Sequence, residues 1–161
     1  MQNGWIRPSI FFRIDHVNPL NRKCVNDGEK LSTAVLNLEV EEGVSLEALA
    51  QALSSIKGCE LEDDGKDVKA YFPSSNTKVF IKKNAIDDSP LTEALEDAGW
   101  RVGRRGYFEV DPSRGNALYD VRTFIETLAD LTSLRFVLSF GYESVYAFYD
   151  NERLTLSEDF K

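Results

Sequence analysis

The chain has 161 residues, of which 42% are hydrophobic and 29% are charged, and its formal net charge at pH 7 is −8. These proportions are typical of a globular protein and exclude an intrinsically disordered one. The sequence holds no apolar run close to the roughly 20 residues that span a bilayer. It also shows no basic region followed by an apolar stretch near its start. We therefore expect a cytoplasmic protein without a membrane segment.

The acidic side chains are concentrated in one part of the chain. Between Glu39 and Asp67, nine acidic side chains stand against two basic ones, which accounts for −7 of the total charge. Such a field repels nucleic acids and membrane surfaces and attracts basic partners. The alternative is a solvated face that only keeps the protein soluble.

The first predicted elements are two strands separated by a polar loop. Apolar residues at every second position predict strands over residues 10–15 and 33–41. In the second strand Leu38 and Val40 share one face, whereas Glu39 and Glu41 share the other.

A helix and three short strands are predicted next. Ser45 is a suitable N-cap for a helix over residues 46–56, and Gly58 is suited to end it. A strand around Leu61 and one over residues 68–72 flank the sequence Asp63-Asp64-Gly65-Lys66, which predicts a hairpin. Another short strand is expected over residues 78–82.

The middle of the chain predicts a second helix and a hairpin. Ser89 and Pro90 are typical of a helix N-terminus, and apolar residues at helical spacing extend this helix over residues 89–98. Strands over residues 100–102 and 106–110 are then expected, joined by a hairpin tip at Gly103-Arg104-Arg105.

The last third predicts a long helix followed by strands. Asp111-Pro112 is a possible helix start, although Gly115 makes the first residue uncertain, and the apolar stripe continues to Leu131. Strands are predicted over residues 134–140, 143–149 and 153–156. The hairpin of the first two carries aromatic residues on both faces, so packing against a second copy in a homodimer is an alternative to a monomer.

The two halves of the chain show a faint similarity. Leu38-Glu39-Val40-Glu41 and Phe108-Glu109-Val110-Asp111 each lead into a helix and then three strands. We expect an α+β fold with mainly antiparallel sheet, backed by about three helices, and a possible tandem duplication of a strand–helix–strand–strand–strand unit. Residues 1–161 would form one domain or two packed lobes, 1–84 and 85–161. Chance similarity between two ordinary α+β segments is the alternative.

Residues for catalysis or metal binding are scarce. The single histidine, His16, has only Asp15 beside it, and successive strand residues point to opposite faces. Cys24 and Cys59 lie in unrelated contexts, and no phosphate-binding glycine loop is present. One histidine and two separated cysteines do not make a conventional zinc site. We therefore predict no catalytic residue, no metal and no cofactor.

Two groups of charged residues are candidate recognition sites. If the strands that carry them are neighbours, an acidic surface would combine Glu39, Glu41, Glu60, Glu62, Asp63 and Asp64. A basic hairpin would combine Arg101, Arg104 and Arg105, next to aromatic residues. Arginine with aromatic residues suits single-stranded nucleic acid or a protein interface, although the acidity of the whole chain disfavours nucleic acid.

These features predict a binding protein rather than an enzyme. We expect an acidic module that binds a basic protein, and within that class we favour an inhibitor or immunity-type protein that blocks a basic, nucleic-acid-directed enzyme. One alternative is a small enzyme that uses dispersed carboxylates with Arg104 or Arg105. Another is a nucleic-acid-binding protein that uses the predicted hairpin from Arg101 to Arg105.

Overall fold

The computed structural model describes residues 33–82, 88–95 and 98–161. The predicted strand at residues 10–15, His16 and Cys24 lie outside the described residues. The elements in chain order are β1 (Ala34–Glu41), α1 (Leu46–Ser54), β2 (Glu60–Asp63), β3 (Asp67–Phe72), β4 (Thr77–Lys82), the 3₁₀ turn η2 (Glu93–Leu95), β5 (Val102–Val110), α2 (Tyr119–Leu131), β6 (Phe136–Phe140), β7 (Ser144–Asp150), β8 (Arg153–Leu156) and the 3₁₀ turn η3 (Glu158–Phe160).

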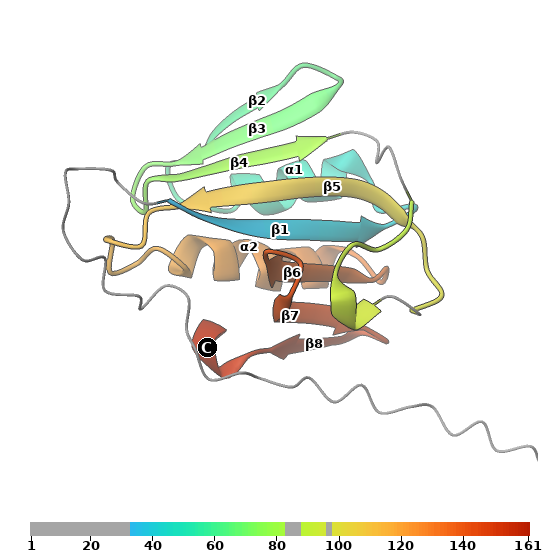
Figure 1. Ribbon diagram of the computed structural model, residues 1–161. Coiled ribbons are helices and arrows are strands. Elements are labelled where there is room, and N and C mark those ends of the chain that lie inside the picture. The colour runs from blue at the N-terminus through green and yellow to red at the C-terminus, as the bar shows by residue number, and fades with distance from the viewer. Residues whose placement is uncertain (1–32, 83–87, 96–97) are drawn as a thin grey trace, which may run out of the picture.

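The strands form one antiparallel sheet of eight strands in the order β2-β3-β4-β5-β1-β6-β7-β8 (Figure 1). The expectation of an α+β fold with mainly antiparallel sheet is confirmed. Strand β1 lies between β5 and β6, so the first half of the chain supplies a strand to the middle of the second half. The two border strands are β2 and β8, which lie at opposite edges of the sheet.

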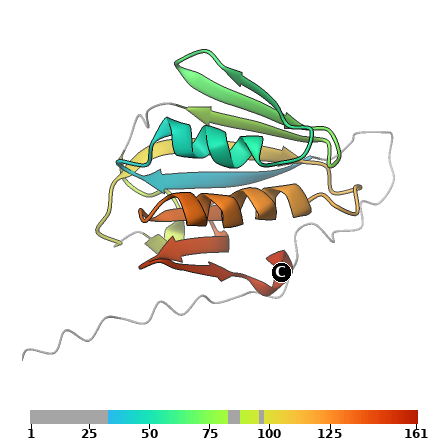
Figure 2. The same cartoon turned by 180° about the vertical axis from the view of Figure 1, so that it is seen from behind.

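Both α-helices cover the same face of the sheet (Figure 2). The N-terminus of α1 is capped as predicted, because the Ser45 hydroxyl accepts a hydrogen bond from the Ala48 amide at 3.1 Å. Leu53 of α1 and Phe124 of α2 are fully buried against the sheet. The strands place alternate apolar residues on this helix-covered face, so one continuous core fills the space between the two layers. Its fully buried members with the largest side chains include Leu36, Leu38, Phe72, Ile81, Phe108, Phe124, Ile125, Leu128 and Phe136.

The other side of the sheet, which we call the second face, carries the remaining side chains of each strand. Residues 88–95 cross this face near β1 and β6, and we call this segment the strap (Figure 1). A small apolar cluster forms there from Leu95, Trp100, Val102 and Val137. Within the described part of the chain, helices therefore cover one side of the sheet, and the strap covers part of the other.

The proposed duplication is not confirmed by the sheet topology. Each half contains a strand, a helix and three further strands, β1-α1-β2-β3-β4 and then β5-α2-β6-β7-β8. However, of the three strands that follow α1, it is the last, β4, that pairs with the central strand β5. Of the three strands that follow α2, it is the first, β6, that pairs with the central strand β1. Equivalent strands therefore occupy different positions in the sheet.

The helix predicted over residues 89–98 does not form in the described part of that range. Only Glu93–Leu95 form one 3₁₀ turn, in which the Leu95 amide donates to the Thr92 carbonyl. The predicted apolar stripe does not face one core, because Leu95 is buried whereas Leu91 is 47% exposed. Within the described residues the α-helices are thus α1 and α2, not the three that the sequence pattern suggested.

Two predicted boundaries also differ from the structure. The expected hairpin tip at Gly103-Arg104-Arg105 is wrong, because β5 continues from Val102 to Val110 without a turn. Helix α2 begins at Tyr119 rather than near Asp111. The Asp111 carboxylate instead accepts hydrogen bonds from the amide and the hydroxyl of Ser113, which makes a local turn that competes with helix formation.

No helix among the described residues is both long enough and apolar enough to cross a membrane.

A substitution at Gly106 would test the close contact between β4 and β5. A Cβ atom at this position would lie 2.7 Å from the carbonyl oxygen of Phe80. We expect Gly106→Ala to lower the free energy of unfolding by about 1 to 3 kcal/mol, because the central strands would have to separate. Urea denaturation measures this change.

Gly115→Ala is the matched control, since a Cβ at Gly115 would meet no atom within 4 Å. It should change stability by less than about 0.5 kcal/mol. An equal loss in both variants would contradict the close packing of β4 on β5.

Candidate functional site

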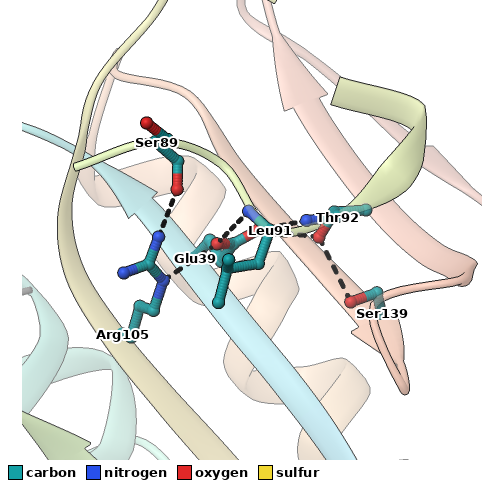
Figure 3. A network of polar contacts seen from close by, with 6 residues as sticks. All are labelled: Glu39, Ser89, Leu91, Thr92, Arg105 and Ser139. Carbon is teal, nitrogen blue, oxygen red and sulfur yellow. Dashed lines mark hydrogen bonds and ion pairs between the residues drawn. The ribbon is translucent and has the colours of Figure 1, made fainter. Parts of the chain in front are cut away.

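The carboxylate of Glu39 is the most densely hydrogen-bonded acid on the second face (Figure 3). Its Oε1 accepts hydrogen bonds from the Leu91 amide at 2.9 Å and from Arg105 Nε at 3.0 Å. Its Oε2 accepts from the Thr92 amide at 3.0 Å and from the Thr92 hydroxyl at 2.7 Å. The Glu39 side chain is fully buried. All of these donors belong to the protein itself, so the carboxylate has a structural role here.

The sheet register explains why this charge is tolerated. Glu39 and Arg105 are directly opposite each other in the β1–β5 pair, so the guanidinium compensates the carboxylate across neighbouring strands. Arg105 also donates from Nη2 to the Ser89 carbonyl. Alternation places Glu39 on the face that the sequence predicted. On that face the strap covers Glu39, so its carboxylate is not part of an accessible acidic surface.

Glu41 is the second acid on the same strand and face. It forms an ion pair with Arg135, with 2.6 Å between Arg135 Nη2 and Glu41 Oε1. The Arg135 amide donates to the same carboxylate at 2.7 Å. Hydrogen bonds from the Arg135 side chain hold the pKa of Glu41 below its ordinary value. Arg135 also lies over the ring of Trp100, with 5.8 Å between the guanidinium carbon and the ring centroid.

The remaining predicted acids lie at one edge of the sheet. All four residues of β2 are exposed, including Glu60, Glu62 and Asp63. Among the described residues, strand β2 pairs with β3 alone, so the other side of its backbone faces away from the described sheet. An edge strand of this kind has backbone N–H and C=O groups available for another strand. Figure 1 shows the β2–β3 hairpin at one border of the sheet, where these acids are exposed.

The turn that follows β2 is built by its own carboxylates. Asp63 accepts a hydrogen bond from the Gly65 amide at 2.8 Å. Asp64 accepts from the amides of Lys66 and Asp67, both at 2.8 Å. The backbone hydrogen bond from Asp67 is the main cause of a lowered pKa at Asp64. The predicted hairpin at these residues is confirmed.

The acidic surface predicted from six residues does not form as one patch. Strands β3, β4 and β5 separate β2 from β1, so the condition that the two acidic strands are neighbours fails. Glu39 and Glu41 are satisfied by Arg105 and Arg135. The accessible group consists of Glu60, Glu62, Asp63 and Asp64, which we call the acidic edge.

The three arginines of the predicted basic hairpin are likewise separated. Arg104 and Arg105 are consecutive residues of β5, so their side chains leave opposite faces of the sheet. Arg104 donates from Nε to the Val44 carbonyl at 3.1 Å, and partial burial lowers its pKa. Arg101 is exposed and pairs with Asp88. The structure does not bring these arginines together at one tip.

A polar cluster that the sequence did not predict lies where the β3–β4 turn meets the start of α2. Asp120 is 5% exposed and accepts hydrogen bonds from the hydroxyls of Ser74 at 2.9 Å and Ser75 at 2.6 Å. The Ser75 hydroxyl also lies 2.9 Å from that of Thr77. The sequence Pro73-Ser74-Ser75-Asn76 signalled a turn, but nothing in it indicated a buried carboxylate 45 residues later. These bonds fasten the turn to the helix.

The described residues offer little for metal or thiol chemistry. No three His, Cys, Asp or Glu residues among them lie close enough together to hold a metal ion. Burial raises the pKa of the Cys59 thiol, and the charge of Asp120 raises it further. The thiol is therefore protonated at neutral pH and is a poor nucleophile.

Comparison with protein-family models, with curated proteins and with solved structures finds no match to this chain. A proposal for its function therefore rests on its own residues and their geometry.

The Glu41–Arg135 pair predicts a pH-dependent contribution to stability. Because the pKa of Glu41 is lowered by folding, its contribution is fully present above the unfolded-state value and is lost as pH falls through the folded-state value. We expect Glu41→Gln to lower the free energy of unfolding by about 1 kcal/mol at neutral pH. The difference from the wild type should shrink as pH falls through the folded-state pKa of Glu41 and vanish at an acidic pH below it, where the carboxyl group is uncharged in both the folded and the unfolded chain.

Urea denaturation at the two pH values measures this effect, and Glu60→Gln is the control because Glu60 is exposed. That variant should match the wild type at both values. A loss in Glu41→Gln that stays constant between them would show that the charge of Glu41 is not the cause.

Proposed function

We propose that this chain is an acidic binding module that recognises a basic protein through the acidic edge. The observation that carries the proposal is that the acids of β1 and those of β2 lie in different environments. Those of β1 are neutralised by Arg105 and Arg135, whereas those of β2 and its turn face the solvent. Accessible like charges raise the association rate of a partner of opposite charge and gain from its binding.

Because β2 is an edge strand, its backbone can form hydrogen bonds with a partner in addition to the contacts of its acidic side chains. A partner segment in an extended conformation would add a strand beside Glu60–Asp63 and form main-chain hydrogen bonds. The side chains of Glu60 and Glu62 share one face of the sheet, and Leu61 and Asp63 share the other. Lysine or arginine residues at alternate positions of such a segment would lie opposite these carboxylates.

An inhibitor or immunity-type protein is the form of this function that we favour. A narrow acidic border strand can enter a cationic groove, such as the nucleic-acid-binding cleft of a basic enzyme, more readily than a broad sheet face can. Charged residues on an edge strand also serve a simpler purpose, because they prevent unwanted pairing of sheets between molecules. The two roles predict different effects of removing the charges, on partner binding in the first case and on self-association in the second.

The test compares an edge variant with a control of equal charge. The edge variant combines Glu60→Gln, Glu62→Gln, Asp63→Asn and Asp64→Asn, whose amides keep the hydrogen-bond acceptors of the turn. The control combines Glu47→Gln, Asp130→Asn, Glu143→Gln and Glu152→Gln, all at exposed positions elsewhere. Each immobilised protein is exposed at low salt to a lysate of its own source and then washed at high salt.

The wild type and the control should capture the same basic protein, and salt should release it. The edge variant should lose at least about tenfold in affinity for that protein, measured with the purified pair. Equal capture by all three proteins would place the interface elsewhere. An edge variant that only self-associates, with no basic protein captured by the wild type, would show that the charges act against aggregation.

A further inference from the structure

Backbone hydrogen bonds join the strap to the second face near each of its ends. The Glu93 amide donates to the Tyr142 carbonyl at 2.9 Å, and the Asp88 carbonyl accepts from the Val102 amide at 2.8 Å. The strap contains no strand and no α-helix. It therefore shares neither the sheet hydrogen bonds nor the main core beneath the helices.

The polar contacts of the strap converge on one side chain. The amides of Leu91 and Thr92 and the hydroxyl of Thr92 all donate to the Glu39 carboxylate (Figure 3). The Arg105 guanidinium links the same carboxylate to the Ser89 carbonyl. Hydrogen bonds to a charged acceptor are stronger than those between neutral groups. Removal of this one carboxylate would leave Thr92, which is fully buried, without its main acceptor.

The strap covers apolar surface that the sheet presents on its second face. Leu95 is buried against a cluster that includes Trp100, Val102 and Val137. Val145 and Phe148 of β7 contact this cluster and are partly buried. Displacement of the strap would expose these side chains together with the Glu39–Arg105 ion pair.

We propose that the strap is a cover that undocks as a local unit while the sheet and its helices stay folded, and that Glu39 is its latch. Proteins open locally at segments with few buried apolar contacts, well before they unfold as a whole. Leu95 is the one fully buried apolar side chain among residues 88–95, and the segment shares no strand or α-helix, whereas β1 beneath it is hydrogen-bonded to β5 and β6 along most of its length. Opening converts a covered part of the second face into an apolar surface bordered by Arg105, distinct from the acidic edge.

Native-state hydrogen exchange of the full chain, read residue by residue by NMR, tests this proposal. The amides of Leu91, Thr92 and Glu93 report on the strap, and those of Leu38 and Leu138 report on the central sheet. In the wild type the strap amides should exchange faster than the sheet amides and depend less on urea. If the two groups exchange at the same rate with the same urea dependence, the strap opens only by global unfolding and the proposal fails.

Two substitutions test the latch, and a third controls for charge. Thr92→Val removes one donor from the strap, and we expect it to accelerate exchange of the strap amides about tenfold without changing the sheet amides. Glu39→Gln should accelerate them about 10- to 100-fold. Glu41→Gln, on the same strand and face, should leave them unchanged.

Thr92→Val decides the question if Glu39→Gln destabilises the whole fold, because the hydroxyl belongs to the strap alone. Strap amides that keep their wild-type rates in Thr92→Val would show that Glu39 is not the latch. Equal acceleration by Glu41→Gln would point to a general charge effect and would also overturn the assignment.

Discussion

A carboxylate buried on the central strand sets the conditions for much of this fold. Glu39 lies at the middle of an eight-stranded sheet with no access to solvent. Removal of a charge from water costs several kcal/mol unless hydrogen bonds and an opposite charge compensate it. Arg105 in the adjacent strand and the amides of the strap supply that compensation. The position of the strap and the choice of residue in β5 are thus both tied to one side chain.

This constraint also separates the acids that shape the structure from those that remain available. Glu39, Glu41 and Asp120 are each held by donors from distant parts of the sequence, and they fasten the strap, β6 and the β3–β4 turn. The carboxylates of Asp63 and Asp64 only organise their own hairpin and stay exposed. A strongly negative segment in sequence therefore becomes a much smaller negative surface in space.

The sequence pattern predicted correctly those helices, strands and turns that neighbouring residues determine. It failed where contacts with residues far away in the sequence determine the conformation. Alternation in β1, the Ser45 cap and the Asp64-Gly65 turn can be read from neighbouring residues, and the structure confirms them. Residues 89–98 resemble a helix start, but the amides of Leu91 and Thr92 bind a carboxylate 52 and 53 residues away. Gly103-Arg104-Arg105 resembles a turn, yet it remains within β5, with an irregularity in the pairing to β1 where Gly103 has no partner. The residues of the acidic edge could be picked out from the sequence by their charge. Their separation from Glu39 and Glu41 follows from the order of the strands in the sheet, which no local pattern encodes.

The insertion of β1 between β5 and β6 bears on how the chain reaches its folded state. Leu36 pairs with both Phe108 and Phe140, so the central strand gains its two neighbours from residues that are synthesised much later. Pairings between such distant segments are slow to form because loop closure costs entropy before any contact repays it. During synthesis on the ribosome, β1 would lack its two partner strands until β5 and β6 have emerged. A charged residue at its centre disfavours pairing with the wrong strand.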